Sequence, residues 1–363
     1  MTNRERVLAC LNYQPYDRLP IIHFGFWWET LAKWRDEGHL TDADVQEWGR
    51  TAAIEKMGFD LEWDPAYHCR YNIDPAFEYE VLEEKPDGTK LVRNWSGAVM
   101  LQKDDAGSIP AEVDHLLKDR ASWEEHYLPR LQFSEARAPV NEAFLTDVHD
   151  DLRGLHCGSL FGHIRDWIGV EGTAYMYADD EELFTEIIDT VGNLCYRNVE
   201  TVLAHGMRFD FAHFWEDICF KNGPLINPAV FDEKVGPHYK RITDLVKQHG
   251  IDIISLDCDG CIDKLVPIWL ENGVNTMFPI EVGTWDASIA PWRAQYGQEL
   301  RGVGGMNKTV FAADRAAVDA EIERLKPLIE LGGFIPCPDH RIPPDAQFEN
   351  VVYYTERMRA IYG

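Results

Sequence analysis

The chain has 363 residues, of which 45% are hydrophobic and 12 are tryptophans, so it can form one large α/β domain with a substantial core. Its formal net charge of −27 argues against binding to nucleic acid, which depends on lysine and arginine. No apolar run approaches the roughly 18 residues of a membrane span, and the start of the chain has no signal-peptide pattern. We therefore expect a cytoplasmic protein with neither a nucleic-acid nor a membrane partner, and with reduced cysteines.

The first 150 residues predict an N-terminal elaboration that includes the first strand. Residues 19–26 (LPIIHFGF) have the apolar run of a buried strand, and residues 29–38 are typical of a helix that ends at Gly38. Residues 76–103 alternate apolar and polar side chains around Pro-Asp-Gly at 86–88, which predicts a β-hairpin.

From residue 152 onward, predicted strands and helices alternate regularly. The strands are predicted at 152–162, 209–218, 251–257, 274–281, 300–306 and 333–339. The helices are predicted at 179–206, 227–250, 262–273, 314–333 and 345–361. Repeated β-then-α units predict a parallel sheet with right-handed crossovers. Their number favours a closed, TIM-type (β/α)8 barrel that makes a single domain of residues 1–363, with the regular units in 151–363.

Polar and aromatic residues follow the predicted strands, where a barrel of this type builds its active site. They are His23, His163, Arg165, Trp167, His213, Glu216, Asp217, Asp257, Asp259, Glu281, Asn307, Lys308, Asp339 and His340. A single carboxylate after a strand is often only the N-cap of the next helix, and this interpretation stays open for Asp217 and Asp263. Six such loops at one barrel mouth nevertheless predict a functional cleft.

The segment 255–261 (SLDCDGC) combines a Cys-x-x-Cys spacing with two aspartates. In an extended chain, Asp257 and Asp259 share one face and Cys258 points to the other. A redox or zinc-knuckle role for Cys258 and Cys261 is disfavoured, because no second cysteine pair completes such a site. The carboxylates are therefore the expected chemical groups.

Four segments together resemble the uroporphyrinogen decarboxylase superfamily. They are RERVLACLNYQPYDRLPI, HFWEDICFKNGPLINPAVFDEKVGPHYKRI, DCDGCIDKLVPIWLENGVNTMFPIE and GGFIPCPDHRIPPD. The resemblance covers nearly the whole chain and implies a (β/α)8 barrel with its cleft at the carboxyl ends of the strands. Two activities are known in this superfamily, uroporphyrinogen decarboxylation and zinc- and corrinoid-dependent methyl transfer.

The region after the first strand separates these two activities. Decarboxylases of the superfamily carry an arginine-rich segment of the type Arg-Gln-Ala-Gly-Arg-Tyr, whereas this chain reads FGFWWETLAKWRDEG, with Trp27 and Trp28 and no arginine cluster. An aromatic pocket on an acidic protein suits a substrate with eight carboxylates poorly. The resemblance is therefore nearer to the corrinoid-dependent methyltransferase branch.

The zinc motif of those methyltransferases is altered in this chain. Their His-x-Cys-Gly falls on Asp257–Gly260, and their distant cysteine falls on His340. Carboxylates and imidazole also bind zinc, so the resemblance implies metal ligands Asp257, Asp259 and His340, with Glu281 as a further ligand. Such an ion would polarise an oxygen rather than activate a thiol. A hydrogen-bonded polar floor without metal stays open.

The predicted function is the methyltransferase component of a corrinoid-dependent O-demethylase, moving a methyl group from a small methoxylated aromatic donor to a corrinoid protein. The chain lacks the Asp-x-His-x-x-Gly cobalamin signature, so the corrinoid protein must be a partner. The catalytic candidates are His213, Glu216, Asp339 and His340, the last as metal ligand or general acid. The substrate-binding candidates are His23, Phe24, Trp27, Trp28, His163, Trp167 and Tyr175. The alternative functions are a decarboxylase of a small acid and a non-catalytic barrel that binds a small molecule. The oligomeric state stays open, with a homodimer as one option.

Overall fold

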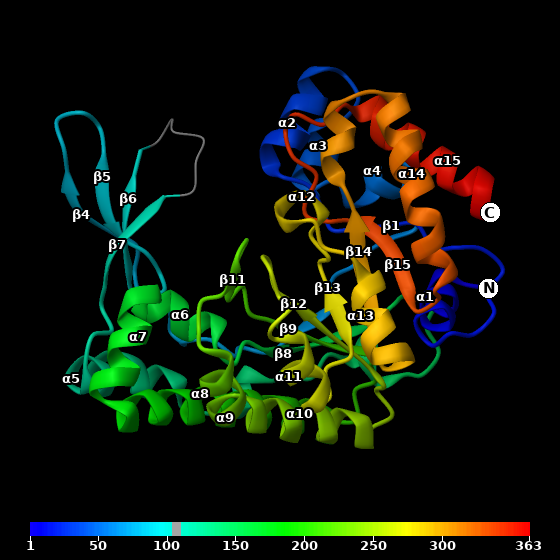
Figure 1. The fold of residues 1–363 in the computed structure, drawn as a ribbon. Coiled ribbons are helices and arrows are strands. Elements are labelled where there is room, and N and C mark those ends of the chain that lie inside the picture. The colour runs from blue at the N-terminus through cyan, green and yellow to red at the C-terminus, as the bar shows by residue number, and fades with distance from the viewer. Residues whose placement is uncertain (104–109) are drawn as a thin grey trace.

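A computed structural model of the chain describes residues 1–103 and 110–363 (Figure 1). Its centre is a seven-stranded sheet in the order β15-β14-β13-β12-β9-β8-β3, in which every pairing is parallel. The strands are β3 (Tyr67–His68), β8 (Gly154–Gly158), β9 (Phe211–Trp215), β12 (Ile253–Asp257), β13 (Thr276–Phe278), β14 (Arg301–Met306) and β15 (Phe334–Pro338). The predicted α/β fold with a parallel sheet is confirmed.

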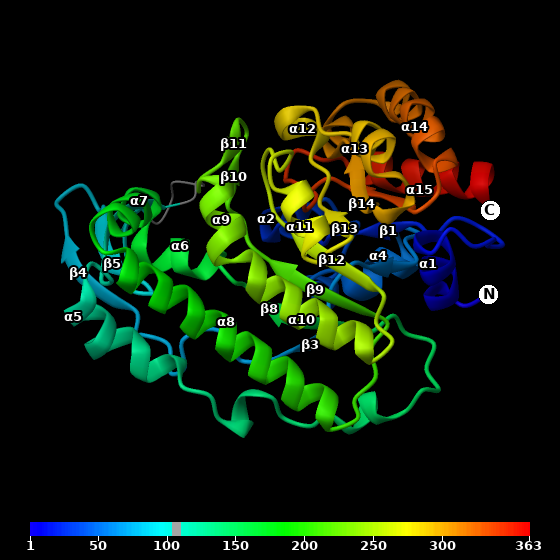
Figure 2. The ribbon, with the colours of Figure 1, turned by 60° about the horizontal axis from the view of Figure 1, so that its bottom comes forward.

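Helices connect these strands and cover the outside of the sheet (Figure 2). They are α6 (Gly162–Ile168), α7 (Val170–Asp179), α8 (Glu181–Ala204), α9 (Pro228–Lys234), α10 (Gly236–Gln248), α11 (Val266–Glu271), α12 (Val282–Trp285), α13 (Ile289–Tyr296), α14 (Arg315–Glu330) and α15 (Phe348–Tyr362). Figure 2 shows α8 and α10, which contact each other, running together past β8 and β9. A short hairpin of β10 (Cys219–Phe220) and β11 (Gly223–Pro224) follows β9.

Three predicted elements differ from the observed ones for local reasons. The predicted helix 227–250 is divided at Val235, because Pro237 has no amide hydrogen and its ring crowds the preceding turn. The predicted strand 274–281 ends before Pro279, which cannot donate to a strand ladder. Of the predicted strand 19–26, only β1 (Ile22–His23) forms, because the chain turns at Gly25 with φ +79°.

The N-terminal segments bring a second parallel pair of strands to the edge of the sheet. They are α1 (Asn3–Leu11), β1, α2 (Trp28–Asp36), α3 (Asp42–Gln46), α4 (Arg50–Glu55) and β2 (Leu61–Glu62). Strand β1 pairs in parallel with β2, and Phe26 forms a parallel bridge with Ile342, just beyond β15. Residues 61–68 therefore run from β2, beside β1, to β3, beside β8.

A separate four-stranded antiparallel sheet stands at one end of the molecule, away from both termini (Figure 1). Its strands are β4 (Glu80–Glu84), β5 (Lys90–Arg93), β6 (Ala98–Gln102) and β7 (Ala111–His115). Strands β4 and β5 pair around residues 86–88, so the predicted hairpin is confirmed. Short helical turns return the chain to β8: α5 (Arg120–Ser122), η1 (Trp123–Tyr127), η2 (Leu128–Leu131), η3 (Glu135–Arg137) and η4 (Glu142–Leu145).

The cysteines and helices of the described residues add two plain findings. All eight cysteines are free, and most are buried. Among residues 1–103 and 110–363, no helix combines the length and the apolar character that crossing a membrane requires.

Candidate functional site

A cavity of about 490 Å³ opens at the carboxyl ends of the parallel strands. Its carboxylates are Asp64, Asp217, Asp257 and Asp259. Its imidazoles are His68, His156, His163, His213 and His340. Its other lining residues are Phe24, Trp27, Trp63, Pro65, Tyr71, Trp215, Phe278 and Arg341. The cavity is therefore acidic in one part, rich in imidazoles in another, and walled by aromatic rings.

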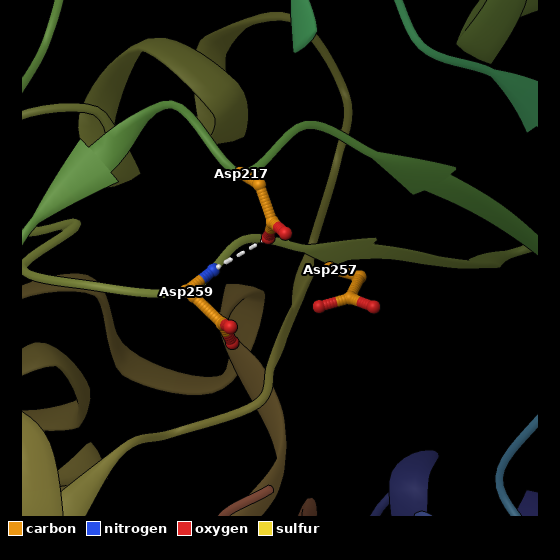
Figure 3. A group of neighbouring side chains, drawn as sticks. All are labelled: Asp217, Asp257 and Asp259. Carbon is orange, nitrogen blue, oxygen red and sulfur yellow. Dashed lines mark hydrogen bonds between the residues drawn. The ribbon is translucent and has the colours of Figure 1, made fainter. Parts of the chain in front are cut away.

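Three of the carboxylates form a compact group that we call the acid triad: Asp217, Asp257 and Asp259. One oxygen from each lies within 4.8 Å of the other two. Asp257 ends β12, Asp259 follows two residues later, and Asp217 lies in the loop after β9, the neighbouring strand (Figure 3). The Asp259 amide donates a 3.1 Å hydrogen bond to Asp217 Oδ1, which ties the two loops together.

The backbone of this loop explains why the carboxylates and not the cysteine face the cavity. Cys258 is fully buried on the other side of the chain, and its Sγ accepts a 3.4 Å hydrogen bond from the Ile218 amide. Gly260 has φ +88°, and a Cβ there would lie 2.5 Å from the Cys219 carbonyl oxygen. The loop can pass this close to the β10 hairpin only with glycine.

Burial makes the triad electrostatically unfavourable when it is fully ionised. Burial and then the neighbouring Asp217 and Asp259 carboxylates hold the pKa of Asp257 well above its usual value. Burial and then the Asp259 carboxylate raise the pKa of Asp217 to about 7. His340 lies beside the triad, with its Nε2 3.3 Å from Asp259 Oδ2.

Another part of the cavity lining is an imidazole wall, which we define as His68, His156, His163 and His213. The ring centroid of His156 lies 4.9 Å from that of His68 and 5.4 Å from that of His213. Burial lowers the pKa of His213 to about 3, and burial followed by the nearby histidines lowers that of His156 well below its usual value. Both rings are therefore neutral near pH 7.

His213 presents one ring nitrogen to a neighbouring strand. Its Nδ1 lies 2.7 Å from Ser255 Oγ, and the Ser255 hydroxyl lies 3.3 Å from the Ala212 carbonyl oxygen, to which it can only donate. The Ser255 hydroxyl therefore fixes the orientation of the His213 ring, between β9 and β12.

Glu216, a catalytic candidate from the sequence, is fully buried and does not line the cavity. Its carboxylate accepts hydrogen bonds from the amides of Leu160, Phe161 and Gly162 at 2.8, 2.9 and 2.6 Å. Tyr239 and Ser159 also donate to it through their hydroxyls. It thus holds the N-terminus of α6, where amide hydrogens have no helical partner.

Asp339 and Glu281 occupy similar supporting positions outside the cavity lining. Asp339 is fully buried and accepts hydrogen bonds from the Gly283 amide at 2.7 Å and from the Lys308 amide and Nζ at 3.1 and 3.3 Å. Glu281 accepts from the Gly260 amide at 2.5 Å and from Thr284 Oγ1 at 2.8 Å. The structure therefore places Glu281 next to the acid triad, but its oxygens accept from a backbone amide and a threonine hydroxyl.

The remaining sequence candidates divide into two groups. Those that line the cavity are Phe24, Trp27, His163, His213, Asp257, Asp259 and His340. His23 instead packs between Phe26 and Phe59, Trp28 packs on Trp48, and Trp167 is fully buried. Tyr175 is 66% exposed and lies in a groove beside β7.

Sequence reasoning missed many of the other residues that line the cavity. The missed residues are Trp63, Asp64, Pro65, His68, Tyr71, His156, Trp215, Phe278 and Arg341. The run 61–68 (LEWDPAYH) carried the available signal, because it contains a tryptophan, an aspartate and a histidine beside short apolar stretches. Asp217 had been left open as a helix cap, but its side chain belongs to the triad.

Comparisons with known proteins support the fold. No family model and no curated protein matches the chain. The structure is similar to a methyltransferase from Methanosarcina mazei, with a TM-score of 0.62, 16% sequence identity and full coverage of both chains. A B12-independent methionine synthase from Shewanella sp. W3-18-1 in complex with selenomethionine matches over 95% of this chain and 98% of that chain, at 8% identity and a TM-score of 0.48, which is too low to support an argument. At 16% identity, the first likeness shows a shared fold.

Proposed function

We propose that the chain is the methyltransferase component of a corrinoid-dependent O-demethylase, a cytoplasmic enzyme that takes a methyl group from a small methoxylated aromatic compound. The observation that carries this proposal is the meeting of aromatic rings with the acid triad and His340 in one cavity. The rings suit an aromatic donor, and the acidic groups suit the activation of its ether oxygen.

Phe24, Phe278 and Trp27 form the proposed aromatic side of the donor site. The Phe24 ring packs edge-on against Phe278 at 4.6 Å and against His340 at 5.6 Å, and Trp27 stacks over His340 at 6.0 Å. A donor ring held between these side chains would bring its ether oxygen toward His340 and Asp259. Such packing excludes water and positions the donor.

His340 is the proposed proton donor to the departing oxygen. The methyl group would leave as a methyl cation equivalent, and the electron pair for its new bond would come from the cobalt(I) corrinoid of the partner protein. The C–O electron pair would stay on the oxygen, which would take a proton from His340 and leave as a phenol. A hydrogen bond to developing oxyanion charge is commonly a large catalytic term. A divalent metal at the triad would polarise the same oxygen. The sequence predicts zinc there, with Asp257, Asp259, Glu281 and His340 as ligands, and this stays a prediction.

We also infer that β1 and the seven strands of the parallel sheet form a distorted (β/α)8 barrel. We further infer that residues 1–363 make one domain, with the elaboration in 1–150. The seven-stranded sheet has β3 and β15 at its edges, and β1 lies between β2 and the segment after β15. Residues 61–68 would close the ring, because β2 at their start pairs with β1 and β3 at their end pairs with β8.

The proposed function is tested by incubating the purified protein with cob(I)alamin, in place of the carrier protein, and a panel of methoxylated aromatic compounds. We expect the absorbance of methylcobalamin to appear together with the corresponding phenol. No methylcobalamin with any donor, with and without added divalent metal, would overturn the proposal.

A decarboxylase of a small acid is a second candidate, and Arg341 is the observation that favours it. This exposed guanidinium lines the cavity mouth, 5.9 Å from the Phe24 ring centroid, and makes no ion pair with any residue that the structure describes. It could hold a substrate carboxylate. Release of CO2 from small aromatic acids, without methyl transfer, would favour this function instead.

A further inference from the structure

The acid triad contains carboxylate oxygens that the protein leaves open. Asp257 is only 8% exposed, yet its carboxylate has no hydrogen bond or ion pair with any residue of 1–103 or 110–363. Asp259 Oδ1 is buried and also lacks a partner among these residues. A buried carboxylate is ordinarily paired, hydrogen-bonded or bound to a metal. Asp257 therefore points to a ligand that belongs in the cavity.

Among the described residues, no lysine or arginine forms an ion pair with the triad, and the charges of Arg341 and Arg165 act on it without direct contact. Arg165 pairs with Asp166 at 3.0 Å, and Arg341 makes no ion pair within the described part of the chain. Within the triad, His340 contacts Asp259, and its side chain is half-buried. Two further acids, Glu216 and Asp339, are buried nearby, but backbone amides satisfy them. The triad thus offers carboxylate oxygens to a positively charged ligand in the cavity.

The spacing of the triad suits a single divalent ion. One oxygen from each aspartate lies within 4.8 Å of the others. Two oxygens on opposite sides of an ion, bound at about 2.1–2.4 Å, lie roughly 4.2–4.8 Å apart. Small side-chain rotations would thus bring all three oxygens to one ion, and the open cavity leaves room for water ligands or substrate.

The donor atoms indicate which divalent ion fits. All three ligands are carboxylate oxygens, and the Cys258 thiol, which lies between Asp257 and Asp259 in the chain, is turned into the core. Oxygen-only sets favour Mg²⁺, Mn²⁺ or Ca²⁺, whereas thiolate and imidazole favour zinc. Glu281, a ligand in the sequence prediction, already accepts from the Gly260 amide and Thr284.

We infer that Asp217, Asp257 and Asp259 bind an oxygen-preferring divalent cation of the Mn²⁺ or Mg²⁺ class rather than zinc. The inference rests on the proposed function only for the role of the ion in activating the donor; binding itself is independent of the reaction. Asp217, which the sequence left open as a helix cap, takes the place of Glu281 in the ligand set.

The test is titration of the EDTA-treated protein with MnCl2. Binding is measured by calorimetry and by the loss of the electron paramagnetic resonance signal of free Mn²⁺. We expect one ion per chain, competition by Mg²⁺, and dissociation constants at least about tenfold higher in Asp217→Asn, Asp257→Asn and Asp259→Asn. Asp286→Asn is the matched control: Asp286 has φ +63°, like Asp217 with φ +50°, but it is exposed and outside the cavity.

Three results would overturn the inference. The first is no Mn²⁺ or Mg²⁺ binding, or binding that the three variants leave unchanged. The second is zinc binding that His340→Ala abolishes and Asp217→Asn preserves, which would restore the sequence-based ligand set. The third is tight binding of tetramethylammonium in place of metal, which would make the triad a site for an organic cation. Mn²⁺ binding without methyl transfer would overturn the proposed function alone, whereas methyl transfer in a protein that binds no Mn²⁺ or Mg²⁺ would overturn this inference alone.

Discussion

Two sets of acidic side chains follow the parallel strands, and they differ in what their oxygens contact. Glu216 and Asp339 are fully buried, and backbone amides from other loops donate hydrogen bonds to their oxygens. The acid triad lies at the same level of the fold, but Asp257 has an unpartnered carboxylate within the described residues. The first set fixes loops, and the second set is free to act on a ligand.

Position after a strand therefore does not by itself identify a functional carboxylate. Glu216 and Asp217 are adjacent in the chain, yet one faces the amides at the start of α6 and the other faces the cavity. Asp217 adopts a left-handed backbone, φ +50°, which turns its side chain away from that of Glu216. Saturation of hydrogen bonds, rather than burial, separates the two roles.

Glu216→Ala should produce the largest effect, because it removes the acceptor for three backbone amides and two hydroxyls. The buried donors would lose their partners, and we expect the free energy of unfolding to fall by about 3 kcal/mol or more. Urea denaturation measures this loss.

The control for that variant is Glu182→Ala, an exposed glutamate in the first turn of α8. Its effect should stay within about 0.5 kcal/mol. Stability of Glu216→Ala close to that of the wild type would show that Glu216 does not support the loop, and would return it to the catalytic candidates.

Much of the fold was predictable from the sequence because local periodicity and turn signals agree with the tertiary structure. The strand 251–257 and the helix 314–333 were predicted within a few residues of β12 and α14. The segment 61–68 was not recognised, because β2 and β3 contain two residues each and carry no periodic pattern. The place of β3 beside β8 depends on pairing between residues that are far apart in the sequence, such as Tyr67 with Leu155.

The candidate site was predictable in part for a related reason. Alternation along an extended chain correctly placed Asp257 and Asp259 on one face and Cys258 on the other. The sequence could not separate Glu216 from Asp217, because the amides that satisfy Glu216 come from residues 160–162 on another strand's loop. It also could not show that Tyr175 would face a groove beside β7.

Asp217→Asn should have an intermediate effect on the free energy of unfolding. Unlike Glu216→Ala, it should stabilise the metal-free protein. The pKa of Asp217 is about 7 in the folded state, because of burial and then of Asp259, against about 3.9 when unfolded. The folded state therefore favours the protonated form, and stability falls as pH rises from about 4 to 7. Asparagine removes that fall, so the variant should be more stable by about 1–2 kcal/mol at pH 8 and equal near pH 4, after allowance for partial exposure.

Urea denaturation at the two pH values, with EDTA present, measures this difference. Asparagine tolerates the left-handed backbone and can still accept from the Asp259 amide, so the change is confined to charge. Asp286→Asn, an exposed left-handed aspartate, should show no pH-dependent gain. An equal gain at pH 4 and pH 8 would show that repulsion within the triad is not its source.

His340→Ala should have the smallest effect on stability, and His39→Ala is its matched control. Each histidine is half-buried, each has Nε2 3.3 Å from a carboxylate oxygen, and each stacks on an aromatic ring. Partly exposed pairs of this kind contribute little, so the free energy of unfolding should fall by less than about 1 kcal/mol in both variants.

The two variants should differ in turnover, because of this pair only His340 lines the cavity. If His340 donates a proton to the leaving oxygen, methyl transfer should fall by about 10²- to 10⁴-fold in His340→Ala and stay unchanged in His39→Ala. Mn²⁺ titration of the same variant separates the roles, because a proton donor can be lost while the ion stays bound. Equal turnover in the two variants would remove His340 from the chemistry and leave it as a partner of Asp259.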